Sequence, residues 1–116
     1  MNLEYIKEDL LYEVSSKYIQ IYNTPVYING MDYELRRLYE IQFKIAEAEK
    51  EGKEDITQVM EDGFLYSPLD SARATLTCLK KRLKDFDTAY EMHKNHINTL
   101  TSLDEAREYN TAQFWP

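Results

Sequence analysis

The sequence predicts an all-α fold, a small helical bundle in which two N-terminal helices pack on one long C-terminal helix, with short flanking helices. Three observations predict it. The chain has only three Gly and three Pro among 116 residues, which favours long elements with few tight turns. Apolar residues recur at spacings of three and four through most of the chain, as on one helix face. The length suits a single helical domain over residues 1–116.

The first helix is expected over residues 3–21. It should end before Asn23-Thr24-Pro25, because Pro disfavours helical backbone in the residue before it. A rival interpretation is a minor β-hairpin near residues 18–28, since these residues include two β-prone segments on either side of the Asn-Thr-Pro sequence. The apolar face of the helix consists of Leu3, Ile6, Leu10, Val14, Tyr18 and Ile21.

The second helix is expected from about residue 31 until Gly52. Asn29-Gly30 indicates a turn, and Asn29 is placed to cap the helix, with Asp32 in the acidic capping position. Gly52 is typical of a C-terminal cap. The inward face consists of Met31, Leu35, Leu38, Ile41, Ile45 and Ala48.

The strongest local signal is the start of a long helix. Ser67 is a favoured N-cap residue and Pro68 suits the first helical position. From there apolar positions alternate at spacings of three and four without Gly or Pro, which predicts one helix over residues 68–99. This stripe must pack on the shorter helices, on a second copy or on a partner, and all three stay open. The stripe, called the seam below, consists of Leu69, Ala72, Leu76, Leu79, Leu83, Phe86, Tyr90, His93, Ile97 and Leu100.

Two short helices and a tail complete the predicted fold. The first short helix is expected at residues 54–62, where the apolar side chains are helically spaced. The second is expected at residues 103–110, because Ser102 and Glu105 have capping-box spacing. Residues 111–116 form an apolar C-terminal tail that contains the only Trp.

The charge is unevenly distributed. The formal net charge is −7, which argues against direct binding to a nucleic-acid backbone. Bases flank the seam at Arg73, Lys80, Arg82 and Lys94, and the acidic first helix is their expected complement. An acidic patch consists of Glu47, Glu49, Glu51, Glu54, Asp55, Glu61 and Asp62. It is interpreted as a solvated helix end, or alternatively as a surface that imitates nucleic acid.

Tyrosines suggest a surface for a protein partner. Seven of the ten Tyr fall within the first 39 residues. Tyr combines a large contact area with a polar tip and is enriched at interfaces. The tail either docks on the domain or forms an exposed anchor. The candidate partner-binding residues are Tyr5, Tyr12, Tyr22, Tyr33, Phe114 and Trp115.

Catalytic and metal sites find little support. The sequence has no phosphate-binding Gly-rich loop and no nucleophile motif, so we expect no catalytic residue and no cofactor. His93 and His96 could ligate one metal ion, but the spacing better suits one seam His and one surface His. Cys78 is alone and falls at an outward heptad position, and no secretory leader is evident, so we expect a cytoplasmic protein. No apolar stretch is long enough to cross a membrane.

These observations predict a non-enzymatic helical interaction protein, an assembly, adaptor or accessory component that binds a protein partner or itself. Small, acidic, tyrosine-rich chains without catalytic motifs resemble the accessory proteins of phages and mobile elements. One alternative is an acidic inhibitor that blocks a nucleic-acid enzyme through the acidic patch. A second alternative is a small metal-dependent enzyme that uses the two His.

Overall fold

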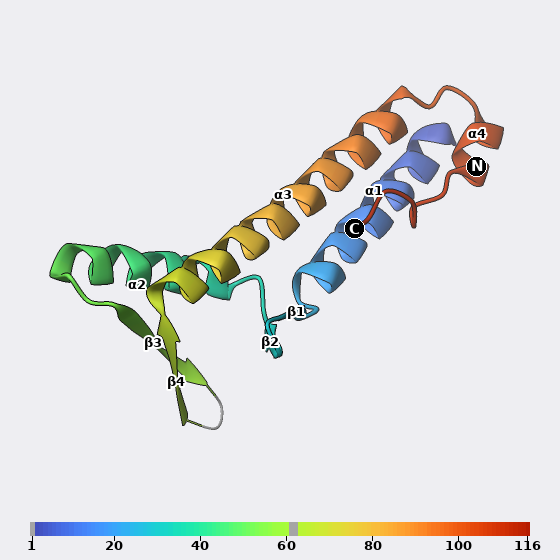
Figure 1. Cartoon of the computed structure of the whole chain (residues 1–116). Helices are drawn as coiled ribbons and strands as arrows, with labels where there is room; N and C mark the ends of the chain where they lie inside the picture. Colours follow the sequence, from blue (N-terminus) through green and yellow to red (C-terminus); the bar gives the residue numbers. More distant parts are fainter. Residues whose placement is uncertain (1, 61–62) are drawn as a thin grey trace. The chain divides into compact units, whose positions relative to one another are not determined.

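The computed structural model describes residues 2–60 and 63–116 (Figure 1). Its elements are α1 (Leu3–Tyr22), β1 (Val26–Ile28), β2 (Met31–Tyr33), α2 (Arg37–Glu51), β3 (Asp55–Met60), β4 (Gly63–Pro68), α3 (Leu69–Thr99) and α4 (Leu103–Glu108). Strands β1 and β2 form one antiparallel sheet, and β3 and β4 form another. The prediction of an all-α bundle is therefore wrong, because the fold is a helix-dominated α/β fold with two hairpins.

The first hairpin turns at Asn29-Gly30. Both residues have positive φ, 51° and 85°, which is the backbone of a two-residue hairpin turn that matches the twist of the flanking strands. The prediction that Asn29 caps a helix starting at residue 31 is therefore wrong, and α2 begins only at Arg37. The rival prediction of a hairpin near residues 18–28 placed a strand correctly at residues 26–28 but paired it with the wrong segment. Residues 18–22 belong to α1, and the partner of β1 is β2.

The second hairpin replaces the helix predicted at residues 54–62. In β3 the buried Ile56 and Gln58 alternate with the exposed Val59, which is the two-residue period of a strand with one buried face. Ile56 lies opposite Ser67, and Gln58 lies opposite Leu65. Glu61 and Asp62, which the prediction included, lie outside the described residues.

Other predicted boundaries are confirmed. Helix α1 ends at Tyr22, just before Asn23-Thr24-Pro25, and α3 runs from Leu69 to Thr99. The prediction that Ser67 caps this helix and that Pro68 is its first residue is wrong, because both residues end β4 and the Ser67 hydroxyl accepts from Gln58. Gly52 ends α2 with a φ of 70°, and its N–H donates to the carbonyl of Ala48. The hydroxyl oxygen of Ser102 accepts from the N–H of Glu105 at 3.2 Å, as a capping residue does.

The chain forms two compact units. Met1–Tyr22 and Arg82–Pro116 form one, called the helical unit below, and Asn23–Lys81 form the other, called the hairpin unit. Helix α3 contributes its first part to the hairpin unit and the remainder to the helical unit. A single domain over residues 1–116 stays a prediction.

In the helical unit α1 runs antiparallel to the second part of α3 (Figure 1). The Lys7 ammonium donates to the carbonyls of Asn98 and Leu100 at 3.1 and 3.2 Å. Further along, the Tyr18 hydroxyl donates to Asp87 at 2.7 Å. The core consists of the buried Leu10, Val14, Ile97 and Ala106, with half-buried Leu3, Ile6, Leu11, Tyr90, Leu100, Tyr109 and Trp115 around it. This burial of apolar surface is the main force that holds the unit together.

In the hairpin unit the inward side chains of α2 form the centre of the core. Leu35, just before the helix, and Ile41 within it are almost fully buried. The other buried apolar residues of this unit are Ile28, Tyr33, Leu38, Ile45, Ala48, Ile56, Ala72 and Leu79. Arg73 of α3 bonds to Glu49 of α2 at 2.8 Å. Among the described residues, every helix is too short or too polar to span a lipid bilayer.

Candidate functional site

The β3–β4 hairpin has one face in the protein and one face in solvent. Ile56, Gln58 and Ser67 are buried on the inner face. On the outer face Val59, Phe64 and Tyr66 are 63%, 69% and 70% exposed. We call this outer surface, with Thr57, the hairpin face. Val59 lies opposite Phe64 and Thr57 lies opposite Tyr66, so the four side chains share one side of the sheet.

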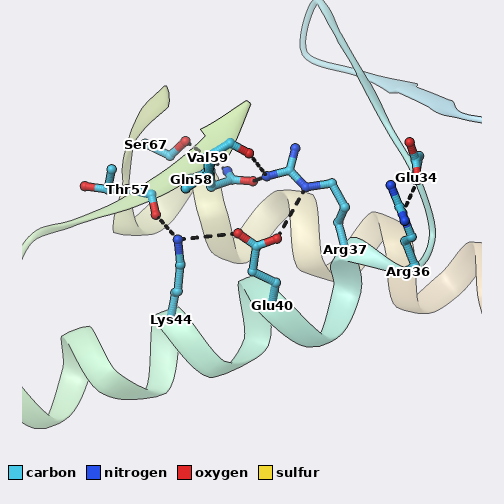
Figure 2. A network of polar contacts seen from close by, with 9 residues as sticks. All are labelled: Glu34, Arg36, Arg37, Glu40, Lys44, Thr57, Gln58, Val59 and Ser67. Atoms are coloured by element: carbon cyan, nitrogen blue, oxygen red, sulfur yellow. Dashed lines mark hydrogen bonds and ion pairs between the residues drawn. The ribbon is translucent and has the colours of Figure 1, made fainter. Parts of the chain in front are cut away.

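A polar network from α2 holds β3 in place (Figure 2). Arg37 donates to the side-chain oxygen of Gln58 at 2.8 Å and to the carbonyl of Val59 at 3.5 Å. Lys44, two turns further along α2, donates to the carbonyl of Thr57. Glu40 lies between the two cations, 3.6 Å from Arg37 and 3.4 Å from Lys44. The network thus fixes the backbone of β3 against one side of the helix.

Buried Gln58 is the centre of this network. Its side chain is 1% exposed, and burying an amide without partners costs about 1–3 kcal/mol. Its oxygen accepts from Arg37, and its nitrogen donates to the hydroxyl of Ser67 on β4 at 3.4 Å. Both strands are therefore linked to α2 through one buried side chain.

A cleft of about 820 Å³ lies beside the network. It is lined by Pro25, Met31, Asp32, Glu34, Arg36, Arg37, Glu40, Val59, Gly63, Phe64 and Leu65. Arg36 forms an ion pair with Glu34, and Arg37 forms one with Glu40 (Figure 2). Four of the charged residues in this cleft are thus paired with one another, and Arg37 also bonds to the hairpin.

The predicted partner-binding tyrosines do not gather on one surface. Tyr5 and Tyr12 on α1 are 56% and 75% exposed, whereas Tyr22 is half-buried. Tyr33 is only 5% exposed, and the Arg37 guanidinium lies 5.8 Å from its ring centre. The expectation that Tyr33 lies at a surface is therefore wrong, because β2 turns that side chain into the core of the hairpin unit.

The C-terminal tail docks on His93. The His93 side chain is fully buried, and its Nε2 donates to the Gln113 carbonyl at 2.7 Å. Its Nδ1 then accepts from the Tyr109 hydroxyl, also at 2.7 Å. The Trp115 ring stacks on the imidazole with ring centres 5.2 Å apart, and Phe114 contacts it from another side. Burial raises the pKa of Tyr109, and a side-chain hydrogen bond with Gln113 offsets part of this rise.

The tail is therefore held in place, although Phe114 is 44% exposed. Phe114 has a φ of 72°, in the left-handed region that a non-Gly residue rarely adopts. Its ring contacts both His93 and His96.

Among the described residues, no group of three His, Cys, Asp or Glu side chains is placed to hold a metal ion. Cys78 is exposed, as its heptad position predicts.

Seam residues are all buried or half-buried. The members in the hairpin unit are Leu69, Ala72, Leu76 and Leu79, and those in the helical unit are Leu83, Phe86, Tyr90, His93, Ile97 and Leu100. In the helical unit Tyr90, Ile97 and Leu100 pack against the core residues of α1 and α4. This part of the seam is thus used within the chain.

The acidic patch is exposed where it is described, at Glu47, Glu49, Glu51, Glu54 and Asp55. Glu61 and Asp62 lie outside the described residues. Glu49 bonds to Arg73, so the base that was expected to complement α1 pairs with α2. Glu51 bonds to Lys53 at 2.9 Å, and this hydrogen bond raises the pKa of Lys53. Cations thus neutralise part of the patch.

Sequence reasoning missed the hairpin face. Two signals were present: β-branched and aromatic residues on both sides of Asp62-Gly63, and that Asp-Gly pair itself, which is typical of hairpin turns. Comparisons with known proteins add no further guide, because the chain matches no known family model, no curated protein and no solved structure.

Proposed function

We propose that this chain is a non-enzymatic protein-binding protein, an adaptor or assembly component, and that the hairpin face is its partner surface. One observation carries the proposal. Val59, Phe64 and Tyr66 lie together on one face of a hairpin and are 63–70% exposed. Contiguous apolar surface of this kind is typical of interaction sites, whereas single exposed apolar residues are ordinary.

The backing of the hairpin supports this role. Arg37, Lys44 and Gln58 tie β3 to α2, so the face is presented on an ordered backbone. A surface that is ordered before binding loses less conformational entropy in the complex. Fully burying a side chain such as Phe64 contributes about 1.5–3 kcal/mol, so the aromatic residues of the hairpin face are suited to supply much of the binding energy of a contact.

A binding role also agrees with the surrounding chemistry. The ionisable groups beside the face, Arg37, Glu40 and Lys44, are engaged in holding the strands. Part of the seam, the other surface expected to bind a partner, is used inside the helical unit. We place the protein in the cytoplasm, where an exposed lone thiol such as Cys78 stays reduced.

The test compares two pairs of exposed aromatic residues. Phe64→Ser/Tyr66→Ser removes the aromatic part of the hairpin face, and Tyr5→Ser/Tyr12→Ser removes equally exposed rings from α1. Tagged proteins are used to capture partners from native lysate, followed by quantitative mass spectrometry. We expect a specific set of proteins to be lost only with the first pair.

Circular dichroism checks that both variants melt like the parent, because exposed substitutions change stability by only about 0.5 kcal/mol. Partners that depend on Tyr5 and Tyr12 and not on Phe64 and Tyr66 place the surface on α1 and refute this assignment. If both double variants capture the same proteins as the parent, the assignment of the partner surface to the hairpin face is refuted as well.

A further inference from the structure

Side-chain contacts to β3 show which way its backbone groups point. Lys44 donates to the carbonyl of Thr57, and Arg37 donates to the carbonyl of Val59 (Figure 2). Both carbonyls therefore point away from β4 and toward α2. The outer edge of β3 is covered by these two side chains.

The register carries this direction over to β4. Thr57 lies opposite Tyr66, and Val59 lies opposite Phe64. In an antiparallel strand pair, two opposite residues either exchange two backbone hydrogen bonds, or both point their N–H and C=O groups away from the other strand. The N–H and C=O groups of Phe64 and Tyr66 therefore point to the outer edge of β4. In the described part of the chain, no backbone hydrogen bond outside the helices and sheets reaches these groups.

We propose that β4 pairs antiparallel with β4 of a second copy of this chain, with Leu65 opposite Leu65 of the second copy. An edge with unpaired donors and acceptors is a template for another strand. The inference rests on the proposed function, because it names a partner for the same hairpin. The product is a four-stranded sheet across a two-fold axis, in which the same surface serves both chains.

Hydrogen bonding selects this register. Phe64 lies opposite Tyr66 of the second copy, and each residue donates to and accepts from the other. The two-fold axis repeats this pair, so all outward groups of Phe64 and Tyr66 in both chains are satisfied. Moving the axis to Tyr66 places Phe64 opposite Pro68, which has no N–H to donate.

Side chains favour the same arrangement. Phe64 and Tyr66 lie on the hairpin face, so each ring meets the other kind of ring across the new strand pair. Cross-strand aromatic pairs of this kind stabilise antiparallel sheets. On the inner face the half-buried Leu65 meets its own copy. Two-stranded hairpins are marginal alone, and pairing converts two of them into a larger sheet.

Area and charge determine how strong the pairing is. The four rings offer at most about 600–1,000 Å², which is below the roughly 1,200 Å² of stable interfaces. We therefore expect a weak dimer that forms at high protein concentration. Each chain carries a formal charge of −7, so salt should strengthen the pairing by screening repulsion. A basic foreign partner at the same edge shows the opposite salt dependence.

Sedimentation equilibrium on the full chain at low and high salt is the first test. We expect the mean mass to rise from one chain toward two with concentration, and more readily at high salt. Tyr66→Pro removes an outward N–H without removing a bond to β3, and it should weaken the dimer by at least about tenfold. Tyr66→Lys, which keeps the strand and adds an edge charge, serves if the proline variant does not fold. Tyr39→Ser, an exposed aromatic of α2, is the matched control and should change nothing.

A cross-link tests the register. Opposite residues that exchange no hydrogen bonds have Cα atoms about 4.5 Å apart, within disulfide range. In a Cys78→Ser background, Leu65→Cys should form an interchain disulfide on mild oxidation. Thr57→Cys, on the covered strand β3, should not. Equal cross-linking at the two positions, or a monomer at every concentration, overturns the inference.

The two proposals fail in different ways. A monomeric chain whose partner capture still depends on Phe64 and Tyr66 refutes the dimer and supports the proposed function. In the converse outcome, the Leu65→Cys variant forms the interchain disulfide, but substituting Phe64 and Tyr66 does not change which proteins are captured. This result supports the dimer and refutes an adaptor role for the hairpin face.

Discussion

His93 is the side chain whose removal should most change the helical unit. It is fully buried, it bonds to Tyr109 and Gln113 at 2.7 Å each, and Trp115 stacks on its ring. His93→Ala removes all three contacts at once. The variant therefore tests whether the tail is part of the folded unit.

The expected cost follows from these contacts. Each lost hydrogen bond contributes about 1 kcal/mol net, and the stacked ring adds about 0.5–1.5 kcal/mol. The unfilled space adds a further cavity cost, so we expect a loss of about 3–4 kcal/mol. This is a large fraction of the roughly 5–15 kcal/mol that is typical of folded domains, so the loss is measurable.

Trp115 gives a direct assay, because it is the only Trp and it lies on His93. Urea unfolding is followed by Trp115 fluorescence and by circular dichroism. In His93→Ala we expect a lower unfolding midpoint and, before unfolding, a red-shifted emission with stronger quenching by iodide. The red shift reports that the indole has moved into water.

His96→Ala is the matched control. It is the same substitution on the same helix, three residues on, at an exposed position. The two variants have the same change in helix propensity, so their difference isolates the buried contacts. The reasoning is refuted if His93→Ala loses no more stability than His96→Ala and the emission of Trp115 stays unchanged.

Three further predictions concern both units. Gln58→Ala removes the buried amide that accepts from Arg37 and donates to Ser67, and should cost about 1–3 kcal/mol in thermal unfolding. Gly30→Ala places a Cβ at a φ of 85° and should cost about 1–2 kcal/mol, measured in the same way. Burial raises the pKa of Tyr109, so the folded state keeps a proton that the unfolded state releases above about pH 10. Stability should therefore fall as the pH rises above that value, and Tyr109→Phe should weaken this fall.

Each of these has a control and a contrary result. Gln42→Ala, on the exposed side of α2, should leave the melting temperature unchanged, and an equal loss in both variants contradicts the role of Gln58. Asn29→Gly keeps a turn-compatible residue and should be tolerated better than Gly30→Ala; the reverse order contradicts the turn assignment. An alkaline stability profile that is identical in the parent and Tyr109→Phe contradicts the assignment of that proton.

Part of the fold follows from local sequence. Helices α1 and α3 are long, with apolar residues at spacings of three and four, and local signals lie next to their ends. Pro25 follows α1, and Ser67-Pro68 comes directly before α3, although as the end of β4 and not as the predicted cap and first helical residue. The caps at Gly52 and Ser102 also depend only on neighbouring residues. Such features need no distant contact, so the sequence predicts them directly.

The hairpins show where local reasoning ends. Ile56, Val59 and Met60 have spacings that suit a helix, whereas the β-branched Ile56, Thr57 and Val59 favour a strand. The choice depends on what lies beside them. Lys44 and Arg37 of α2 donate to backbone carbonyls on the outer edge of β3. If residues 55–60 formed a helix, these carbonyls would already accept from N–H groups of the same helix, so the strand is the conformation that leaves them free for α2.

The candidate sites divide in the same way. Residue spacing alone predicts the seam, the outward position of Cys78 and the capping of α4, because each is a property of one helix. Tertiary packing decided that Tyr33 is buried and Phe64 and Tyr66 are exposed. It also decided that the tail lies on His93, through bonds between residues 16 and 20 positions apart. The physical reason is that one residue type satisfies both environments: a tyrosine packs in a core or binds at a surface, and only the neighbours supplied by the fold determine which.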